Sequence, residues 1–513
     1  MKSNSIFLLF CFSLLVLPTF ASGSKLGTVQ NLISPPVTET SNSITLLWNK
    51  ALDYKDVVGY DIYVDGKNVG FSKITNYTIN GLKPNRNYSV SIVSKDVNGE
   101  KSEISKPITV KTKPQAKVFN VLDYGAKSDS GIVNTRAIQK AIDACTVGGI
   151  VIIPTGTFIS GALFLKSNMT LYIAKGGVLK GSANREDYMP LIKTRFEGWE
   201  FLAYASLITA GKLDEKGPCN VKNISIRGEG KISGGGTQLG KDMIEANGIR
   251  SRGRLICLMN CENVNIQGLT IEESPCWTIH YTYSKNVTCN GLNIISTAPN
   301  GDGIDPDSSL NSYIFNCTFS NGDDCIAIKS GKNPEGNKVA IPCENVYISN
   351  CNFKVGHGLS IGSEISGGIN NVQVTDCELG NLMNGLQIKT TEKRGGFIEN
   401  VLVQDCNVQK ITMFTSLPYN NDGDSAPTLT RLKNFEFANL NMTKANTKKP
   451  VIYLKGFGDT ANYAKNIKFK NIQLPADSKI FIQHAENVLF ENVQTVDDKK
   501  PIYEIIECND LKY

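Results

Sequence analysis

Four short polar motifs carry the side chains that could do chemistry. Asp302 and Asp323 are 21 residues apart, Asp324 and His357 are 33 apart, and His357 and Lys389 are 32 apart. Each separation is about one coil of a solenoid built from short strands. The spacing therefore predicts three carboxylates, an imidazole and an ammonium stacked on one face of a rigid cylinder. Two opposed carboxyl groups are what glycosidic hydrolysis requires. The motifs are Asn300-Gly301-Asp302, Gly322-Asp323-Asp324, Gly356-His357-Gly358 and Gln387-Ile388-Lys389.

The motifs also keep a common phase relative to a repeating asparagine. Asp324 lies 13 residues after Asn311, and His357 lies 12 residues after Asn345. The first and last charged residues of the set follow their own asparagines by 16 and 18 residues. Any one motif alone is typical of a solvated turn. A shared phase on adjacent coils favours a site on a well-packed strand, which positions side chains better than a loop does.

The repeat itself predicts the fold. Each marker asparagine is followed five places later by Asn or Asp and six places later by an apolar residue. Asn and Asp tolerate left-handed backbone angles at sharp bends. The pattern predicts an all-β domain over residues 118–513, a right-handed parallel β-helix of about ten coils. A leucine-rich repeat is the alternative, but its leucine pattern is missing. The markers, spaced by 21 to 34 residues, are Asn311, Asn345, Asn371, Asn400, Asn434, Asn466 and Asn487.

The elements before the repeat predict a cap and a separate domain. Residues 134–145 have the apolar face of an amphipathic helix, which suits a cap over the first coil. Residues 28–113 alternate short apolar segments with turns, including a hairpin signal at Asp65-Gly66. Trp48, Tyr60, Leu82 and Tyr88 stand in the order of a fibronectin type III domain, which this segment resembles. Residues 114–117 are the expected linker.

The ends and the composition limit the function classes. Residues 1–21 resemble a secretory signal, so we expect a secreted or periplasmic protein with no membrane span. The net charge of +6 permits an acidic substrate, and no basic cluster interleaved with aromatics suggests nucleic acid. We expect a monomer. No Cys/His spacing resembles a zinc site, and we expect no cofactor.

The cysteines predict packing more than cross-links. The sequence has 14, and 13 remain without Cys11 of the signal, so at least one thiol is unpaired. Four share one position of the repeat, which indicates a stack of small buried apolar side chains. The four are Cys317, Cys351, Cys377 and Cys406.

The four polar motifs resemble the active-site motifs of the polygalacturonase family, family 28 of the glycoside hydrolases. The resemblance extends from Val118 to about Gly396 and implies an inverting hydrolase of α-1,4 galacturonosidic bonds in pectin. It implies that Asp323 is the general acid, which keeps its proton near neutral pH. It implies that Asp302 and Asp324 hold and deprotonate the attacking water. His357 would hydrogen-bond the acid, and Lys389 would pair with a uronate carboxylate of the pectic poly- or oligosaccharide.

The fourth motif departs from the family pattern. The family has Arg-Ile-Lys where this chain has Gln387-Ile388-Lys389. Arginine can grip a carboxylate with a bidentate fork, and glutamine cannot. Either another cation compensates, for which Arg394 is the candidate, or the sugar is not a plain galacturonate. The second case would fit a decorated pectin or a rhamnogalacturonan-type hydrolase.

Two further segments resemble those of family members that trim chain ends. They are Arg195-Phe196-Glu197-Gly198 and residues 274–280, and they favour exo action. A pectate or other polysaccharide lyase is an alternative, and so is a non-catalytic carbohydrate-binding β-helix. A lyase needs a base near the sugar C5, often with calcium. Asp302, Asp305 and Asp307 lack the spacing of a calcium-ligand loop, and a non-catalytic protein has no reason to keep acid and histidine in phase.

Overall fold

The computed structural model describes residues 26–129, 131–380, 382–416 and 422–513. The expected signal sequence, residues 1–21, lies outside these residues. Within the described part of the chain, no helix is long and apolar enough to cross a membrane.

The N-terminal segment forms a sandwich of a three-stranded and a four-stranded antiparallel sheet, as the fibronectin type III pattern predicts. Trp48 and Tyr60 meet edge to face at 5.3 Å in its core. Asp65 and Gly66 both have positive φ, at 49° and 77°, as the hairpin turn requires. The hydroxyl of Tyr88 accepts a hydrogen bond from the Lys83 N–H at 2.8 Å. The strands are β1 (Gln30–Ile33), β2 (Ile44–Asn49), β3 (Val57–Val64), β4 (Lys67–Ser72), β5 (Asn76–Ile79), β6 (Asn87–Asp96) and β7 (Ile108–Lys111).

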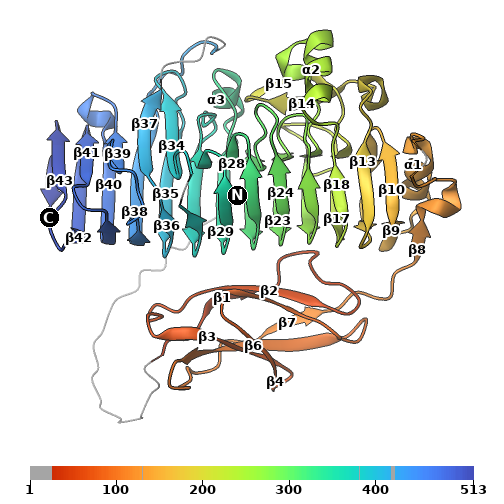
Figure 1. Cartoon of the computed structure of the whole chain (residues 1–513), viewed down its shortest axis with the longest axis horizontal. Coiled ribbons are helices and arrows are strands. Elements are labelled where there is room, and N and C mark those ends of the chain that lie inside the picture. Colours follow the sequence, from red (N-terminus) through yellow and green to blue (C-terminus); the bar gives the residue numbers. More distant parts are fainter. Residues whose placement is uncertain (1–25, 130, 381, 417–421) are drawn as a thin grey trace, which may run out of the picture.

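The second domain is a right-handed parallel β-helix, in which every coil contributes strands to three faces (Figure 1). The third face is a sheet of twelve parallel strands in the described residues, so the molecule has somewhat more than the ten coils expected. That sheet contains β11 (Leu163–Leu165), β16 (Ile208–Ala210), β19 (Ile256–Met259), β22 (Ile279–Thr282), β25 (Ile304–Asp307), β28 (Asp324–Ile328), β31 (Gly358–Ile361), β34 (Leu386–Thr391), β37 (Ile411–Ser416), β39 (Ile452–Lys455), β41 (Lys479–Gln483) and β43 (Ile502–Ile506).

The first and second faces are joined into one sheet of 23 described strands, because the long strands of the last coils continue from one face to the next. The first face contains β8 (Val118–Asn120), β9 (Gly149–Ile153), β12 (Met169–Ile173), β17 (Val221–Gly228), β20 (Cys261–Gln267), β23 (Lys285–Asn290), β26 (Leu310–Phe315), β29 (Cys343–Ser349), β32 (Ile369–Thr375), β35 (Phe397–Gln404), β38 (Arg431–Asn441), β40 (Ala464–Leu474), β42 (Ala485–Thr495) and β44 (Asn509–Lys512). The second face contains β10 (Gly156–Ser160), β13 (Gly177–Gly181), β18 (Lys231–Ser233), β21 (Thr270–Glu272), β24 (Asn293–Ser296), β27 (Thr318–Asn321), β30 (Asn352–Val355), β33 (Glu378–Leu379) and β36 (Asn407–Val408).

The repeating asparagines stand where the sequence predicts sharp bends. Asn311 and Asn345 have φ of 59° and 57°, and Asn316, five places after the first, has φ of 56°. The marker side chains also stack. The amide of Asn345 donates to Asn311 at 2.9 Å, and Asn311 donates to Asn286 at 2.9 Å. This amide ladder satisfies the polar side chain that each left-handed bend requires, so successive coils stay in register.

The apolar side chains of successive coils form one continuous buried core from Phe119 to Val493. The repeating cysteines stack within it. All 13 cysteines among the described residues are free thiols, which confirms the predicted packing role. The thiol of Cys351 donates to the Ser349 carbonyl oxygen at 3.4 Å, and burial raises the pKa of this thiol well above its usual value.

Three helices and a hairpin interrupt the coils. The expected cap is α1 (Thr135–Ala144), whose Ile138, Ala141 and Ile142 are buried. The sequence analysis did not predict α2 (Gly236–Asn247), α3 (Glu335–Val339) or the antiparallel hairpin of β14 (Ile192–Phe196) and β15 (Trp199–Ala203). All of these are insertions between coils, and an insertion has no repeat to reveal it. Short 3₁₀ turns occupy Val121–Tyr124, Arg185–Tyr188, Ile249–Ser251 and Thr460–Asn462.

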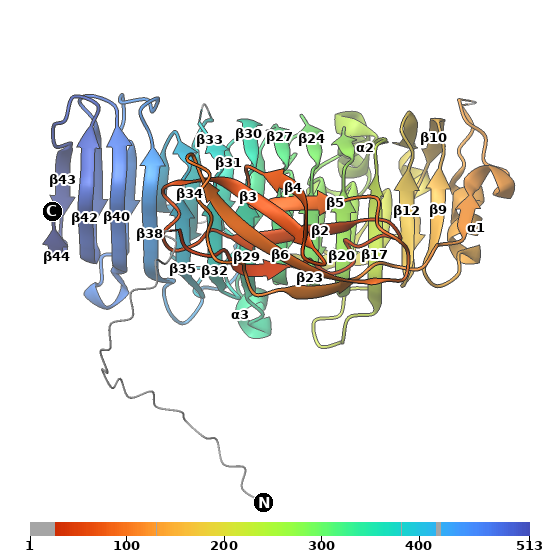
Figure 2. The ribbon, with the colours of Figure 1, turned by 90° about the horizontal axis from the view of Figure 1, so that it is seen from below.

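The fibronectin-like domain lies alongside the β-helix, across the turns between its first and second faces (Figures 1 and 2). Lys50 Nζ lies between Asp376 and Asp405, the two places among the repeating turn residues where aspartate replaces asparagine. The Tyr54 hydroxyl donates to Asp405 at 2.8 Å. Asn76 exchanges side-chain hydrogen bonds with Asn316. The contact between the domains is therefore polar and specific.

Candidate active site

Four neighbouring strands of the third face bring the polar motifs together. The sheet order is β25–β28–β31–β34, so motifs far apart in sequence occupy successive coils. Asp302 comes just before β25, and Asp324 begins β28. The Gly303 N–H donates to the Asp324 carbonyl at 3.0 Å, and the His357 N–H donates to the Asp323 carbonyl at 2.9 Å. The predicted stacking is confirmed at the level of the backbone.

Glycine is required beside the histidine. Gly358 has φ of 105°, which side-chain-bearing residues rarely adopt. A Cβ atom there would lie 2.0 Å from the carbonyl oxygen of Gly385 on the next coil. The bend at Gly358 lets His357 project beside the aspartates while β31 stays paired with β34.

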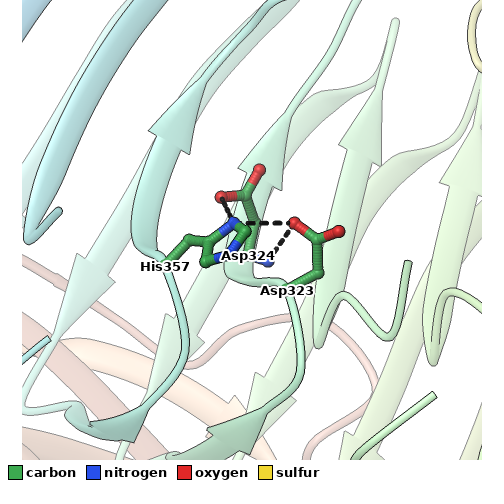
Figure 3. Close-up of side chains that lie close together, drawn as sticks. All are labelled: Asp323, Asp324 and His357. Carbon is green, nitrogen blue, oxygen red and sulfur yellow. Dashed lines mark hydrogen bonds and ion pairs between the residues drawn. The ribbon is translucent and has the colours of Figure 1, made fainter. Parts of the chain in front are cut away.

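Asp323, Asp324 and His357 form a compact group (Figure 3). His357 Nδ1 lies 3.0 Å from Asp323 Oδ1 and 3.9 Å from Asp324 Oδ1. Their donor and acceptor atoms all lie within 4.8 Å of one another. The group is compact enough for a cation, but the Asp323–His357 contact has the geometry of a hydrogen bond that a cation would have to replace.

The Asp323–His357 pair holds a proton in common. The hydrogen bond from His357 raises the pKa of the imidazole above 6.5. Burial alone would raise the pKa of Asp323, but the same hydrogen bond outweighs burial, and the net pKa of Asp323 lies below 3.8. The pair therefore carries one transferable proton near neutral pH, located on the imidazole in the ligand-free protein. The sequence analysis expected that proton on Asp323 itself.

The carboxyl groups with raised pKa values lie one coil away. Asp302 is buried, and burial, reinforced by the neighbouring Asp305 carboxylate, raises its pKa well above 3.8. Burial likewise raises the pKa of Asp305 to about 7. The repulsion expected among clustered carboxylates thus acts between Asp302 and Asp305 more than on Asp323.

Asp324 is held by groups from two further coils. Lys389 Nζ lies 2.9 Å from Asp324 Oδ2. The Ser360 hydroxyl donates to Asp324 Oδ1 at 2.6 Å, and the Gln387 amide in turn donates to Ser360 Oγ at 3.3 Å. Ser360 and Gln387 are paired in register on β31 and β34. These contacts fix the orientation of the Asp324 carboxylate.

Two of the predicted substrate-binding residues are buried beneath the surface. Gln387 is 6% exposed, and Arg394 is fully buried. The Arg394 guanidinium donates to Asp422 at 2.7 Å and to Asn333 Oδ1 at 2.6 Å. The structure therefore places Arg394 in an internal ion pair rather than on an open sugar-binding surface. Gln387 lies within the site but contacts Ser360.

One site residue escaped the sequence analysis. Lys329 follows the far end of β28 and is 4% exposed. Its Nζ atom lies 3.3 Å from Asp302 Oδ2 and 3.3 Å from Asp305 Oδ1. A lysine at the end of an apolar strand gives no sequence signal, because its partners are on another coil.

The two segments associated with exo action pack against each other. Phe196, at the end of β14, contacts the Trp277 ring at 4.5 Å. Arg195 is buried and pairs with Asp307 at 2.8 Å, and His280 contacts the other oxygen of Asp307 at 3.3 Å. Asp307 is therefore engaged away from Asp302 and Asp305.

The hairpin tip meets a second insertion. The Asn333 amide, just before α3, donates to the carbonyls of Gly423 and Asp424 at 3.1 and 3.0 Å. A Cβ atom on Gly423 would lie 3.1 Å from the Trp199 ring. The β14–β15 hairpin and residues 422–424 therefore form a continuous wall.

Comparison with known proteins agrees with this site. The profile named Glycosyl hydrolases family 28 matches residues 192–489, well over half of the chain. The chain belongs to glycosyl hydrolase family 28. The match contains all seven site residues expected from the sequence. A Fibronectin type III domain profile matches residues 28–111, and a profile named Rhamnogalacturonase A/epimerase, pectate lyase-like matches residues 118–189.

Individual relatives of this family 28 hydrolase extend over both domains. The chain is 27% identical to an exo-poly-alpha-D-galacturonosidase of Dickeya chrysanthemi, covering 87% of this chain and 86% of that protein. It is similar to a family 28 exopolygalacturonase structure from Yersinia enterocolitica, with 28% identity, a TM-score of 0.85, and coverage of 94% and 99%. An exopolygalacturonase from Thermotoga maritima gives 27% identity and a TM-score of 0.60 over 77% of this chain and 93% of that one.

Family membership decides between the classes left open by the sequence. The protein is a glycoside hydrolase, so the lyase and non-catalytic alternatives are set aside. The rhamnogalacturonase-type match ends at residue 189 and does not include the aspartates or His357. It therefore describes the first coils and not the site.

Proposed function

We propose that this family 28 hydrolase cleaves α-1,4 galacturonosidic bonds from the ends of pectic chains with inversion. The proposal rests on one observation above all: Asp323 shares a hydrogen-bonded proton with His357 while Asp302 and Asp324 lie on the flanking coil and the adjacent position. A general acid and separate water-activating carboxylates are the groups that inverting hydrolysis uses.

Asp323 delivers the proton to the leaving sugar. The proton moves from the His357 imidazolium across the 3.0 Å contact to Asp323, and from Asp323 to the glycosidic oxygen as the bond from C1 to that oxygen breaks. His357 is thus the proton reservoir, and Asp323 is the group that touches the substrate. A sugar over the pair excludes water, which weakens the preference for the separated charges and favours the neutral acid.

Asp302 and Asp324 act on the water. The water oxygen forms the new bond to C1 from the face opposite the leaving group, and its proton passes to a carboxylate. The Ser360 hydroxyl and Lys389 hold Asp324 in one orientation at 2.6 and 2.9 Å. Because the attacking and leaving oxygens are on opposite faces, the product has inverted configuration.

The substrate is recognised through its carboxylates. Lys389 is partly exposed and bound to Asp324 in the ligand-free protein, so a uronate next to it would share the ammonium. The wall formed by the β14–β15 hairpin and residues 422–424 supports action at chain ends, since it obstructs the surface that a continuing chain would follow. The exo-acting relatives support the same choice.

Product analysis tests the proposal. The protein is incubated with polygalacturonate, short oligogalacturonides and rhamnogalacturonan, and the products are separated and their anomeric form is followed by NMR. We expect small saturated products from the first minutes, a slow fall in viscosity and initial release of the inverted anomer. A rapid fall in viscosity would overturn exo action, and cleavage of rhamnogalacturonan alone would transfer the proposal to that substrate.

We also propose that the chain is exported and acts as a monomer. Export rests on the signal-like residues 1–21. Cell fractionation and light scattering test these statements. Enzyme confined to the cytoplasm, or a stable dimer at micromolar concentration, would contradict them.

A further inference from the structure

A buried lysine occupies the centre of the acidic cluster behind the site. Lys329 Nζ contacts Asp302 Oδ2 and Asp305 Oδ1, both at 3.3 Å, and Glu364 Oε2 at 3.9 Å. The ammonium also lies 4.3 Å from the centre of the Trp277 ring. An ammonium is rarely buried without partners because it loses its hydration, so this lysine and the carboxylates must be considered as one unit.

The charges of this unit do not balance without Lys329. Three carboxyl groups, those of Asp302, Asp305 and Glu364, surround a single cation in a site from which water is excluded. Asp305 is fully buried and makes no other printed ion pair. Removing the ammonium would leave only proton uptake to reduce the repulsion between neighbouring carboxylates.

We propose that Lys329 is a positioning residue that keeps Asp302 ionised as a water-activating carboxylate by compensating the buried charge of the Asp302–Asp305 pair. This role rests on the proposed function, in which Asp302 acts on the water. Lys329 itself does not touch the substrate. Its contacts are directed to the face of the aspartates that points into the protein, and its ring contact with Trp277 fixes the ammonium there.

The surroundings of the unit support this role. The ionisable groups that act on Asp302 are Asp305, Lys329, Asp323 and Asp324, and three of the four are acidic. Lys329 is in addition influenced by Glu364. His280, behind Trp277, is uncharged near neutral pH because burial lowers its pKa to about 4. Lys329 is thus the cation in direct contact with Asp302 among the described residues.

The acidic limb of the pH–rate profile tests the proposal. In kcat/KM this limb reports the free-enzyme pKa of the group that must be ionised. We expect Lys329→Met to move the limb to higher pH by about 1–3 units, the usual effect of an opposite charge at such a distance. Lys329→Arg keeps the charge and should leave the limb within a few tenths of a unit. Asp305→Asn should move it to lower pH.

The double variant separates charge from folding. Lys329→Met combined with Asp305→Asn removes one cation and one carboxylate together, so the limb should return toward that of the wild type. Lys50→Met is the matched control, because Lys50 also bridges two aspartates but on the opposite side of the molecule. This control should alter the melting temperature and leave the limb unchanged.

A readout independent of activity distinguishes this inference from the proposed function. Asp302 has a raised pKa in the folded state, so its protonation stabilises the fold at low pH and that contribution is lost as pH rises through the folded value. Lys329→Met should extend this loss to higher pH in thermal melts, and adding Asp302→Asn should abolish the extension. If the wild type cleaves no pectic substrate, the proposed function fails while this test still applies.

Two outcomes would overturn the role of Lys329. One is a folded Lys329→Met protein with an unchanged acidic limb or an unchanged pH dependence of melting. The other, which applies even where Lys329→Met does not fold, is a double variant whose limb coincides with that of Asp305→Asn. Either result would make the lysine a packing residue only.

Discussion

Lys50 Nζ lies 2.9 Å from Asp405 Oδ2, although 355 residues separate them in the chain. Lys50 comes from the fibronectin-like domain and Asp405 from a turn of the β-helix. The second carboxylate, Asp376, is one coil away, so the lysine spans two coils. A small domain bound across successive coils restrains their relative movement, and the site strands belong to the same coils.

The seam between the domains should contribute to stability and not to chemistry. We expect Lys50→Met and Asp405→Asn each to lower the melting temperature, and the double variant to lose less than the sum, because hydrogen bonds to charged groups contribute about 1.5–3 kcal/mol. A chain starting near Ala116 should stay soluble and cleave short oligomers with a lower melting temperature. Additive losses would show that the pair is not coupled, and an inactive truncated protein would show that the domain shapes the site.

Asp323 should be indispensable for turnover. Asp323→Asn keeps the size of the side chain and removes only the transferable proton, so we expect kcat to fall by about 10³-fold or more. Binding of an oligogalacturonide, measured by calorimetry, should change little. Asn316→Asp, a turn residue far from the site, is the control for a changed charge. Substantial residual turnover in Asp323→Asn would falsify the assignment of the acid.

The Asp323–His357 pair should give stability a defined pH dependence. The pKa of His357 is raised, so its contribution is complete below the unfolded value near 6.5 and is lost as pH rises through the folded value. The pKa of Asp323 is lowered, so its contribution is present above 3.8 and is lost as pH falls through the folded value. Melting curves of His357→Ala should lack the decline above about pH 6.5. An identical decline in both proteins would contradict the pairing.

Gln387 should act through Ser360 rather than on the sugar. Gln387→Leu removes the donor to Ser360 Oγ, and the loss of one hydrogen bond of about 1 kcal/mol corresponds to roughly a fivefold lower kcat. KM should change little. Gln387→Arg should also lower kcat, because a second cation would be buried beside Lys389. If instead Gln387→Arg lowers KM for oligogalacturonides at constant kcat, the side chain contacts the uronate, as the sequence comparison implied.

The stacked thiols should be silent in the folded enzyme. Burial raises the pKa values of Cys351, Cys377 and Cys406 well above the usual thiol value, and the thiolate is the reactive form. We expect negligible labelling of these thiols by a thiol reagent until the protein is unfolded. The melting temperature should be the same with and without a reductant. Rapid labelling of the native protein, or destabilisation by reductant, would contradict the free buried ladder.

The fold could be predicted from the sequence because its signal is repeated. Asn311 and its equivalents mark one bend per coil, and each bend needs the same left-handed backbone, so a single local rule recurs over the whole domain. The α2 helix and the β14–β15 hairpin occur once each, so no repeat announces them. The extra coils lie where the marker pattern is weakest, before Asn263.

The site was predicted in part, for a related reason. Asp302, Asp324 and His357 begin strands and therefore keep a fixed phase. Lys329 escaped because its role depends on contacts between coils. Arg394 was misplaced for the converse reason: a charged residue after Lys389 suggests a substrate contact, but its partner Asp422 comes from a distant insertion.

The amide ladder separates two kinds of evolutionary change in this protein. The marker asparagines fix the backbone at one corner of every coil, whereas the connections between markers vary from 21 to 34 residues in this chain. A longer connection can therefore be added at one coil without displacing a carboxylate on the next. The catalytic register is inherited from the ladder, and selectivity for chain ends or chain interiors is free to diverge through the insertions alone.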